Sequence, residues 1–272
     1  MKGETEGRFH TSDVSSITPG PRRATLRTAD GVRIEAVHDP CAKGPADTAI
    51  VVAHGFTGAA TKPAVRRAAG VFAQYAAVIT FSFRGHGRSG GRSTVGDREV
   101  LDLAAAVEWA RSLGYERVVT VGFSMGGSVV LRHAATHRGS GRGRTEAVAA
   151  VSAPARWYYR GTPAMRRVHW LVTRRAGRLV SWLGFATRIH TEEWNPVPLS
   201  PVEAVPLIAP TPLLIVHGDR DPYFPVDHPL MLAAAGPAQL WLEEGMGHAE
   251  NAAGEELLRR IADWLTAARP AG

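Results

Sequence analysis

From about residue 48 onward, the chain alternates short apolar runs with segments of helical character. The apolar runs, which we expect to be strands, are Thr48–Ala53, Ala77–Phe83, Arg117–Val121, Ala147–Val151, Leu213–His217 and Gln239–Leu242. The expected helices are Lys62–Gln74, Asp97–Leu113, Met125–Thr136, Asp227–Ala235 and Glu255–Ala268. Strands that are apolar along their whole length are typical of a parallel sheet covered by helices on both faces. The alternation therefore predicts an α/β fold.

Two further β-type runs, Ala24–Thr28 and Val32–His38, come before this alternation. They are separated by Ala29-Asp30-Gly31, and Asp-Gly between two such runs is a strong hairpin signal. We therefore expect a mostly parallel sheet of eight strands, with this antiparallel hairpin at one edge. Residues 1–21 are polar and mixed, and we expect them to form a flexible N-terminus.

One long stretch interrupts the alternation. Residues 153–211 are too many for a simple crossover, so we expect an inserted helical cap there, with the core formed by 22–152 and 212–272. Apolar residues repeat at helical spacing inside it, at Met165, Val168, Val172, Ala176, Leu179 and Leu183, opposite Arg167, Arg174 and Arg178. Gly177 weakens a helix, so either one helix or two shorter ones fit. In the core, the helix at Asp97–Leu113 carries an apolar stripe at Val100, Leu101, Ala104, Val107 and Trp109.

The positive charge is concentrated in one segment of the chain. Residues 132–188 contain twelve Arg and a single acid, Glu146, so this segment carries +11 while the whole chain carries +7. No nucleic-acid-binding motif accompanies the charge, so we expect a solvated Arg-rich cap surface and no nucleic acid. Attraction of an anionic acyl substrate, or weak contact with an anionic membrane surface, stays open.

Composition excludes several other classes of protein. A hydrophobic fraction of 44% argues against disorder, and the single Cys41 excludes a disulfide scaffold and a multi-cysteine metal site. No apolar run approaches about 18 residues, so we expect no membrane span. The first residues lack the apolar region of a signal peptide, and we expect a cytoplasmic protein. The sequence leaves the oligomeric state open.

A nucleophile motif lies between an expected strand and an expected helix. Gly122-Phe123-Ser124-Met125-Gly126 is a G-x-S-x-G, and so is Gly87-Arg88-Ser89-Gly90-Gly91. Only Ser124 follows a strand and directly precedes a helix, which a nucleophile elbow requires. Backbone N–H groups at a helix N-terminus are free to bind negative charge. We therefore expect Ser124, and not Ser89, to be the nucleophile.

Two further segments could complete a catalytic site. His54-Gly55-Phe56-Thr57-Gly58 follows a buried strand, and the N–H groups of Phe56 and Met125 could form an oxyanion hole, although a Gly-rich turn fits equally well. A serine hydroxyl needs a base, and the base needs a carboxylate to orient it. His248 supplies the base, and Asp219 and Asp221 compete for the acid.

Together these segments resemble the serine-nucleophile branch of the α/β-hydrolase superfamily. The resemblance runs from about residue 22 to 268 and rests on HGFTG (54–58), FRGHGRS (83–89), GFSMGG (122–127), HGDRDPYFP (217–225) and GMGH (245–248). It implies that the acid is Asp221, four residues after His217, and that Ser89 is structural. HGFTG is similar to segments of cinnamoyl/feruloyl-type and other small-acyl esterases, whereas the cap resembles no particular subfamily.

The resemblance implies hydrolysis of a carboxylic ester or thioester of a small molecule through an acyl-enzyme. Ser124 would attack, His248 would act as base and then acid, and Asp221 would orient the imidazole. No metal or organic cofactor is expected. An acyltransferase, a carbon–carbon bond hydrolase or a non-catalytic ligand-binding protein remain alternatives, because the same fold hosts all of them.

Overall fold

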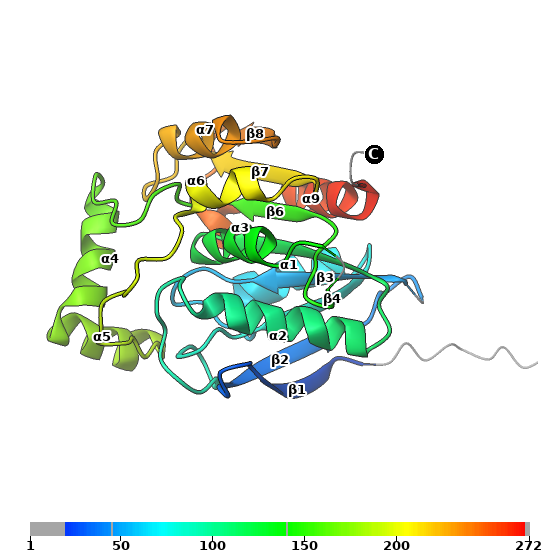
Figure 1. Ribbon diagram of the computed structural model, residues 1–272, viewed down its shortest axis with the longest axis horizontal. Coiled ribbons are helices and arrows are strands. Elements are labelled where there is room, and N and C mark those ends of the chain that lie inside the picture. The colour runs from blue at the N-terminus through cyan, green and yellow to red at the C-terminus, as the bar shows by residue number, and fades with distance from the viewer. Residues whose placement is uncertain (1–19, 45, 140, 270–272) are drawn as a thin grey trace, which may run out of the picture.

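A single eight-stranded sheet organises the computed structural model, which describes residues 20–44, 46–139 and 141–269 (Figure 1). The strands are β1 (Arg22–Arg27), β2 (Arg33–Asp39), β3 (Thr48–Ala53), β4 (Ala77–Phe81), β5 (Arg117–Phe123), β6 (Val148–Val151), β7 (Leu213–Gly218) and β8 (Gln239–Glu243), in the order β1-β2-β4-β3-β5-β6-β7-β8. The β1–β2 and β2–β4 pairs are antiparallel and the other pairs are parallel. The predicted fold class is confirmed. A flexible N-terminus is predicted for residues 1–21, and residues 1–19 of that segment lie outside the described part of the chain.

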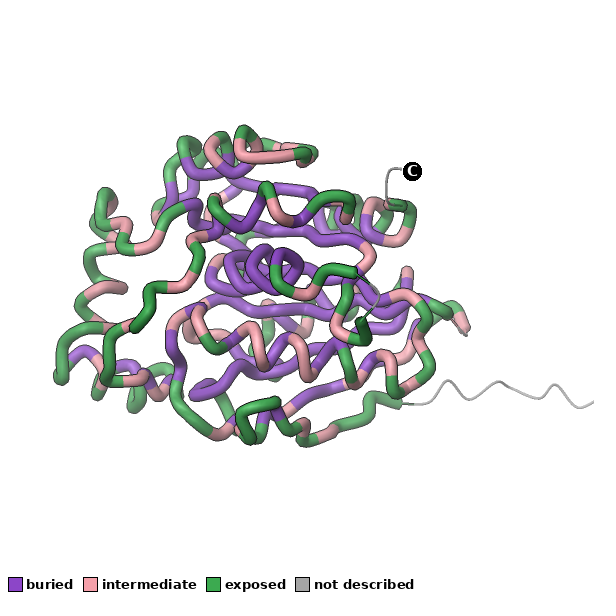
Figure 2. The backbone as a smooth tube through the Cα atoms, viewed as in Figure 1, coloured by how far each residue is buried: buried purple, intermediate pink, exposed green. Residues whose placement is uncertain are grey.

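The central strands are buried on both faces because their side chains alternate between two helical layers. Helices α1 (Pro63–Phe72) and α9 (Glu255–Ala267) cover one face, where Ile50 and Val52 of β3 point. Helices α2 (Glu99–Ser112), α3 (Met125–Thr136) and α7 (Asp227–Ala234) cover the other, where Val51 points. Figure 2 shows the buried strands between these layers. The short α8 (Ala249–Ala252) precedes α9.

The apolar stripe predicted on α2 is confirmed only in part. Val107 is buried, and Val100 and Trp109 are half-buried against the core. The other buried residues of the helix are Glu99, Asp102, Leu103, Ala106 and Ala110. Arg84 donates hydrogen bonds from Nε and Nη2 to the Asp102 carboxylate, and Glu99 accepts hydrogen bonds from Ser93 and Thr94. Because these acids are satisfied by partners on the loop after β4, the helix turns its charged face inward.

Residues 153–211 follow β6 and contain α4 (Pro163–Thr173), α5 (Arg175–Phe185), α6 (Pro201–Ala204) and the short 3₁₀ helix η1 (Val205–Leu207). Of the two forms left open, the structure has two helices, but the break falls at the extended Arg174 rather than at Gly177. Isolated bridges from Thr187 to His86 and from Ile189 to Ser93 join this segment to the loop after β4. That loop leaves the carboxyl end of its strand, and Figure 1 shows α4 and α5 set off to one side of the sheet. No helix in the described ranges is both long and apolar enough to cross a membrane.

Candidate active site

Ser124 occupies a sharp turn between β5 and α3. Its backbone has φ 53° and ψ −116°, a conformation that a residue with a side chain adopts only under strain. Its N–H donates to the carbonyl of Val151 at 2.8 Å, which fixes the turn to the neighbouring strand. A Cβ on Gly122 would lie 2.1 Å from the Gly126 carbonyl oxygen, and one on Gly126 would lie 2.2 Å from that of Ala53. The two glycines of the motif are thus required by close packing of backbone.

The structure brings the predicted nucleophile, base and acid into one hydrogen-bonded chain. His248 Nε2 lies 2.9 Å from Ser124 Oγ, and His248 Nδ1 lies 2.6 Å from Asp221 Oδ2. Since an ionised carboxylate can only accept, the imidazole proton belongs on Nδ1. Nε2 is then free to accept the hydroxyl proton of Ser124, which is the geometry a general base needs.

Asp221 is held as a carboxylate by the turn after β7. Its side chain is 0% exposed, and its Oδ1 accepts the N–H groups of Tyr223 at 2.8 Å and Phe224 at 3.1 Å. Burial acts to raise the pKa of Asp221, but the hydrogen bonds from His248 and the two N–H groups outweigh it and leave the pKa below its usual value. Asp219 instead accepts the Gly245 N–H at 2.6 Å. The geometry therefore favours Asp221 over its competitor.

Two aromatic rings enclose His248 on the side of Asp221. The Tyr223 ring centroid lies 4.3 Å from that of the imidazole, and the Phe224 centroid lies 5.7 Å away. The His248 side chain remains 16% exposed. The packing fixes the orientation of the ring while part of the side chain stays exposed.

The two predicted oxyanion donors lie on segments that border Ser124. Met125 is the first residue of α3, where backbone N–H groups have no partner within the helix. A Cβ on Gly55 would lie 3.4 Å from Ser124 Cβ, so the loop that carries Phe56 is packed against the elbow. Among the described residues, neither N–H donates a hydrogen bond. Both N–H groups therefore have the capacity to bind a substrate oxygen.

Comparison with known proteins agrees with this architecture. A family profile described as alpha/beta hydrolase fold matches residues 48–157. The chain is similar to the Pyrococcus furiosus esterase Pf2001, with a TM-score of 0.69 and 22% identity over 97% of both chains. The chain has the α/β-hydrolase fold.

Other solved structures share the α/β-hydrolase fold with this chain. The α/β hydrolase GrgF from Penicillium sp. sh18 has a TM-score of 0.70 and 19% identity, over 91% of this chain and 98% of GrgF. Est1E from Butyrivibrio proteoclasticus, solved with ferulic acid bound, has a TM-score of 0.59 and 19% identity, over 89% of this chain and 96% of Est1E. A comparison with curated protein sequences finds no match.

Within this α/β-hydrolase fold, His54 supports the loop that carries Phe56. Its Nε2 accepts the Phe83 N–H at 3.0 Å, which places the proton on Nδ1, and Nδ1 then donates to the Gly55 carbonyl at 2.7 Å. Burial, and secondarily the neighbouring His86, lowers the pKa of His54 to about 3. His54 is thus neutral at ordinary pH, and its two ring hydrogen bonds hold the loop at Gly55 to Phe83.

Glu250 is a site residue that the sequence analysis missed. Its Oε1 accepts the Gly55 N–H at 3.0 Å, next to the Phe56 donor, and its carbonyl accepts Arg67 Nη2 at 2.6 Å. The side chain is buried although it lies only two residues after His248, in a short stretch with no recognisable motif. An acid two residues after the expected base, between Ala249 and Asn251, is the one sequence signal that could have indicated it.

We expect Glu250→Ala to lower kcat by about 10- to 100-fold with little change in KM, because a misplaced donor loop acts mainly on the transition state. Glu250→Gln keeps an acceptor oxygen and should retain most of the activity. Steady-state kinetics and thermal melting of both variants measure this, with the exposed Glu244→Ala as control. Equal losses in the Ala and Gln variants would contradict a positioning role.

Ser89, the competing serine, is not available for catalysis. It is buried, its Oγ donates to the Ser82 carbonyl at 2.6 Å, and it accepts the Glu35 N–H at 3.0 Å. It joins the loop after β4 to the edge hairpin. The second G-x-S-x-G is therefore structural.

The sequence predicts no metal or organic cofactor. Within the described ranges, no group of three or more His, Cys, Asp and Glu side chains is placed to hold a metal ion.

His217 is a buried residue next to Asp221. Its Nε2 lies 2.9 Å from the Phe224 carbonyl oxygen, and burial lowers its pKa. It supports the turn that carries Asp221.

Proposed function

We propose that the protein is a serine hydrolase that cleaves a carboxylic ester or thioester through an acyl-enzyme intermediate. The observation that carries the proposal is the hydrogen-bonded chain from Ser124 Oγ through His248 to the buried carboxylate of Asp221. A strained nucleophile, a neutral acceptor nitrogen and an oriented imidazole together satisfy the requirements of nucleophilic acyl transfer.

In the acylation half-reaction, Ser124 Oγ attacks the substrate carbonyl carbon while its proton passes to His248 Nε2. The carbonyl π electrons move to oxygen, and the N–H groups of Phe56 and Met125 stabilise the oxyanion, each donor contributing about 3–4 kcal/mol to lowering the barrier. Collapse of the tetrahedral intermediate breaks the bond to the alcohol oxygen or thiol sulfur. His248 returns its proton to that leaving group, and Asp221 stabilises the transient imidazolium.

Deacylation repeats these steps with water. His248 Nε2 takes a proton from the water, whose oxygen attacks the acyl carbon. The same two N–H groups hold the second oxyanion. Breakage of the bond to Ser124 Oγ then releases the carboxylic acid, and His248 reprotonates the serine. The proposed cycle uses only groups of the chain itself, a substrate and water.

The substrate class that fits best is a small-molecule acyl ester or thioester. The relatives Pf2001, named an esterase, and Est1E, solved with ferulic acid, support ester chemistry on this fold. We also propose that residues 153–211 act as a cap, because this segment joins the loop after β4 on the side of the sheet where Ser124 lies. Transfer to another acceptor or carbon–carbon bond hydrolysis would use the same triad.

The proposal predicts that purified protein hydrolyses p-nitrophenyl esters and that a fluorophosphonate probe labels Ser124. A panel of p-nitrophenyl esters of graded chain length, a feruloyl ester and an acyl-CoA ranks the acyl and leaving groups by kcat/KM. Mass spectrometry of the labelled protein locates the probe. Folded protein that is neither labelled nor active on any member of the panel would favour the non-catalytic alternative.

A further inference from the structure

The helix pair α4–α5 exposes an unusual amount of apolar surface. Twelve large hydrophobic side chains are exposed in the described structure, and half of them lie on this pair: Trp170, Leu179, Val180, Trp182, Leu183 and Phe185. Figure 2 shows this region mainly as exposed and intermediate tube, apart from the buried core. Concentrated exposed apolar surface marks an interaction site.

The outer face of α5 is the strongest part of this surface. Leu179, Trp182 and Leu183 follow one another at helical spacing and are 51%, 55% and 72% exposed. Gly177 and Ser181 lie on the opposite side of the helix and are buried, and a Cβ on Gly177 would lie 2.2 Å from the Trp170 carbonyl oxygen. Since α5 packs on α4 through that side, the Leu-Trp-Leu face points away from the rest of the described structure.

The same helix pair carries uncompensated positive charge. It contains Arg166, Arg167, Arg174, Arg175 and Arg178, and the sequence has no acid between Glu146 and Glu192. Within the described ranges, none of these five guanidinium groups forms an ion pair. Arg175 precedes Leu179 by one helical turn, so a cation borders the apolar face directly.

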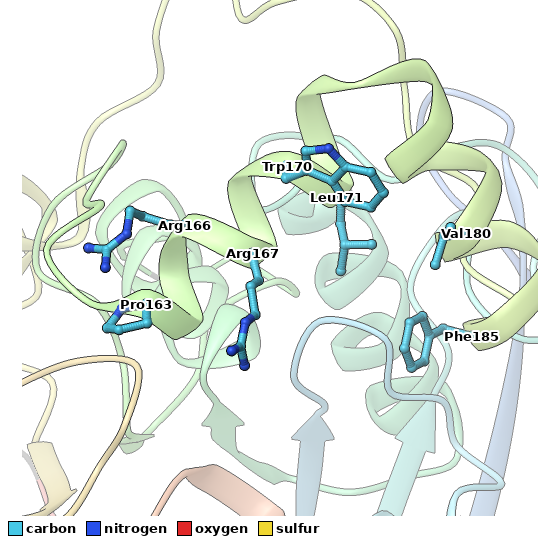
Figure 3. A pocket seen from close by; sticks show the side chains of 7 residues that line it. All are labelled: Pro163, Arg166, Arg167, Trp170, Leu171, Val180 and Phe185. Atoms are coloured by element: carbon cyan, nitrogen blue, oxygen red, sulfur yellow. The ribbon is translucent and has the colours of Figure 1, made fainter.

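The space between the two helices is likewise apolar and bordered by arginines. A hollow of about 590 Å³ lies between the two helices and is lined by Leu171, Val180 and Phe185, together with Arg166 and Arg167. Figure 3 shows how these side chains lie. An apolar hollow bordered by cations suits an acyl chain attached to an anionic headgroup.

We propose that α4–α5 docks on the surface of a lipid bilayer that contains anionic phospholipid. Each helix has 11 residues, too few to span a bilayer, so the pair would lie in the interface with its apolar face among the acyl chains. Tryptophan favours that interface, and arginines attract anionic headgroups. A second copy of the chain would bring the same positive charges to the contact and be repelled. The proposal does not depend on hydrolase activity.

The test is sedimentation of the full chain with vesicles of phosphatidylcholine, alone or mixed with phosphatidylglycerol. Wild-type protein should sediment with the mixed vesicles, less so as salt rises, and little with phosphatidylcholine alone. Arg174→Gln with Arg175→Gln, and separately Leu179→Ser with Leu183→Ser, should each weaken binding to mixed vesicles about tenfold or more. All four side chains are exposed, so thermal melting should be unchanged.

Matched control variants remove the same number of arginines or leucines from exposed positions outside the helix pair. Arg138→Gln with Arg142→Gln takes two exposed charges from the basic segment outside the helix pair, and Leu230→Ser with Leu242→Ser takes two exposed leucines from other elements. Both control variants should bind like wild type. Equal weakening by the controls, or no wild-type binding at low salt, would overturn the proposal.

A second readout distinguishes lipid contact from self-association. Brominated phosphatidylglycerol should quench tryptophan fluorescence in wild-type protein, and much less after Trp170→Phe with Trp182→Phe. A concentration-dependent dimer without vesicles, lost in the leucine variant, together with no quenching, would identify a second copy as the partner instead. Fluorophosphonate labelling of Ser124 in the same samples reports on the proposed hydrolase separately, because binding and labelling can fail independently.

Discussion

Ser124→Ala is expected to lower kcat for p-nitrophenyl ester hydrolysis by roughly 10⁵- to 10⁶-fold, as for removal of the nucleophile in other serine hydrolases. Alanine removes Oγ, the atom 2.9 Å from His248 Nε2, so no acyl-enzyme can form. The oxyanion donors stay in place and can support only a small residual rate with water. Initial rates and fluorophosphonate labelling measure the loss, and circular dichroism checks folding.

Ser89→Ala is the matched control for this prediction. It removes the hydroxyl of the other G-x-S-x-G, which bonds Ser82 and Glu35. The loss should reduce stability by about 1–3 kcal/mol, since a buried donor and acceptor lose their partner, while kcat stays close to wild type. Substantial turnover by Ser124→Ala, or inactivation by Ser89→Ala in a folded protein, would refute the assignment of the nucleophile.

Local signals explain why the sequence predicted most of the fold. The strands β3 to β7 are apolar along nearly their whole length, so each is visible without knowledge of its neighbours. The elbow is equally local, because the strand, Ser124 and the helix are contiguous. Parallel strands place their carboxyl ends at one edge of the sheet, which brings loops that are distant in sequence close together.

The sequence could not predict features that depend on partners far along the chain. Asp102 is buried on α2 because Arg84 reaches it from the loop after β4. The spacing of apolar residues along the helix cannot indicate such an ion pair with a distant residue. Glu250 is buried because Gly55, 195 positions away in sequence, donates to it. Without the family resemblance, the residues alone likewise could not choose between Asp219 and Asp221, whose distances to His248 depend on how the turn after β7 folds.

The helix pair shows a different limit of sequence patterns. The apolar repeat from Met165 to Leu183 would place these side chains on one face of a continuous helix, but the extended backbone at Arg174 rotates the second helix relative to the first. Leu179 and Leu183 consequently face outward instead of joining the interior. Periodicity identifies which residues share a face of a continuous helix, whereas the direction of that face follows from the break and from Gly177 packing on α4.

Asp221→Asn is expected to lower kcat by about 10⁴-fold while leaving the fold intact. The side-chain oxygen Oδ1 accepts two backbone N–H groups, so the asparagine carbonyl must take that position. The amide nitrogen then faces His248 Nδ1 and donates to it, which moves the imidazole proton to Nε2. A protonated Nε2 cannot accept the proton of Ser124, and no carboxylate remains to stabilise the imidazolium.

Asp219→Asn tests whether this effect belongs to the position or to the acidic turn as a whole. Among the described residues, the Asp219 side chain accepts a single hydrogen bond, from the Gly245 N–H at 2.6 Å. An asparagine oxygen can accept the same bond, so kcat should change by less than about tenfold. Steady-state rates and melting temperatures of the two variants give the comparison. A large loss with Asp219→Asn and a small one with Asp221→Asn would assign the acid to Asp219. The opposite result would establish that the imidazole tautomer, set by one buried carboxylate, controls the reactivity of Ser124.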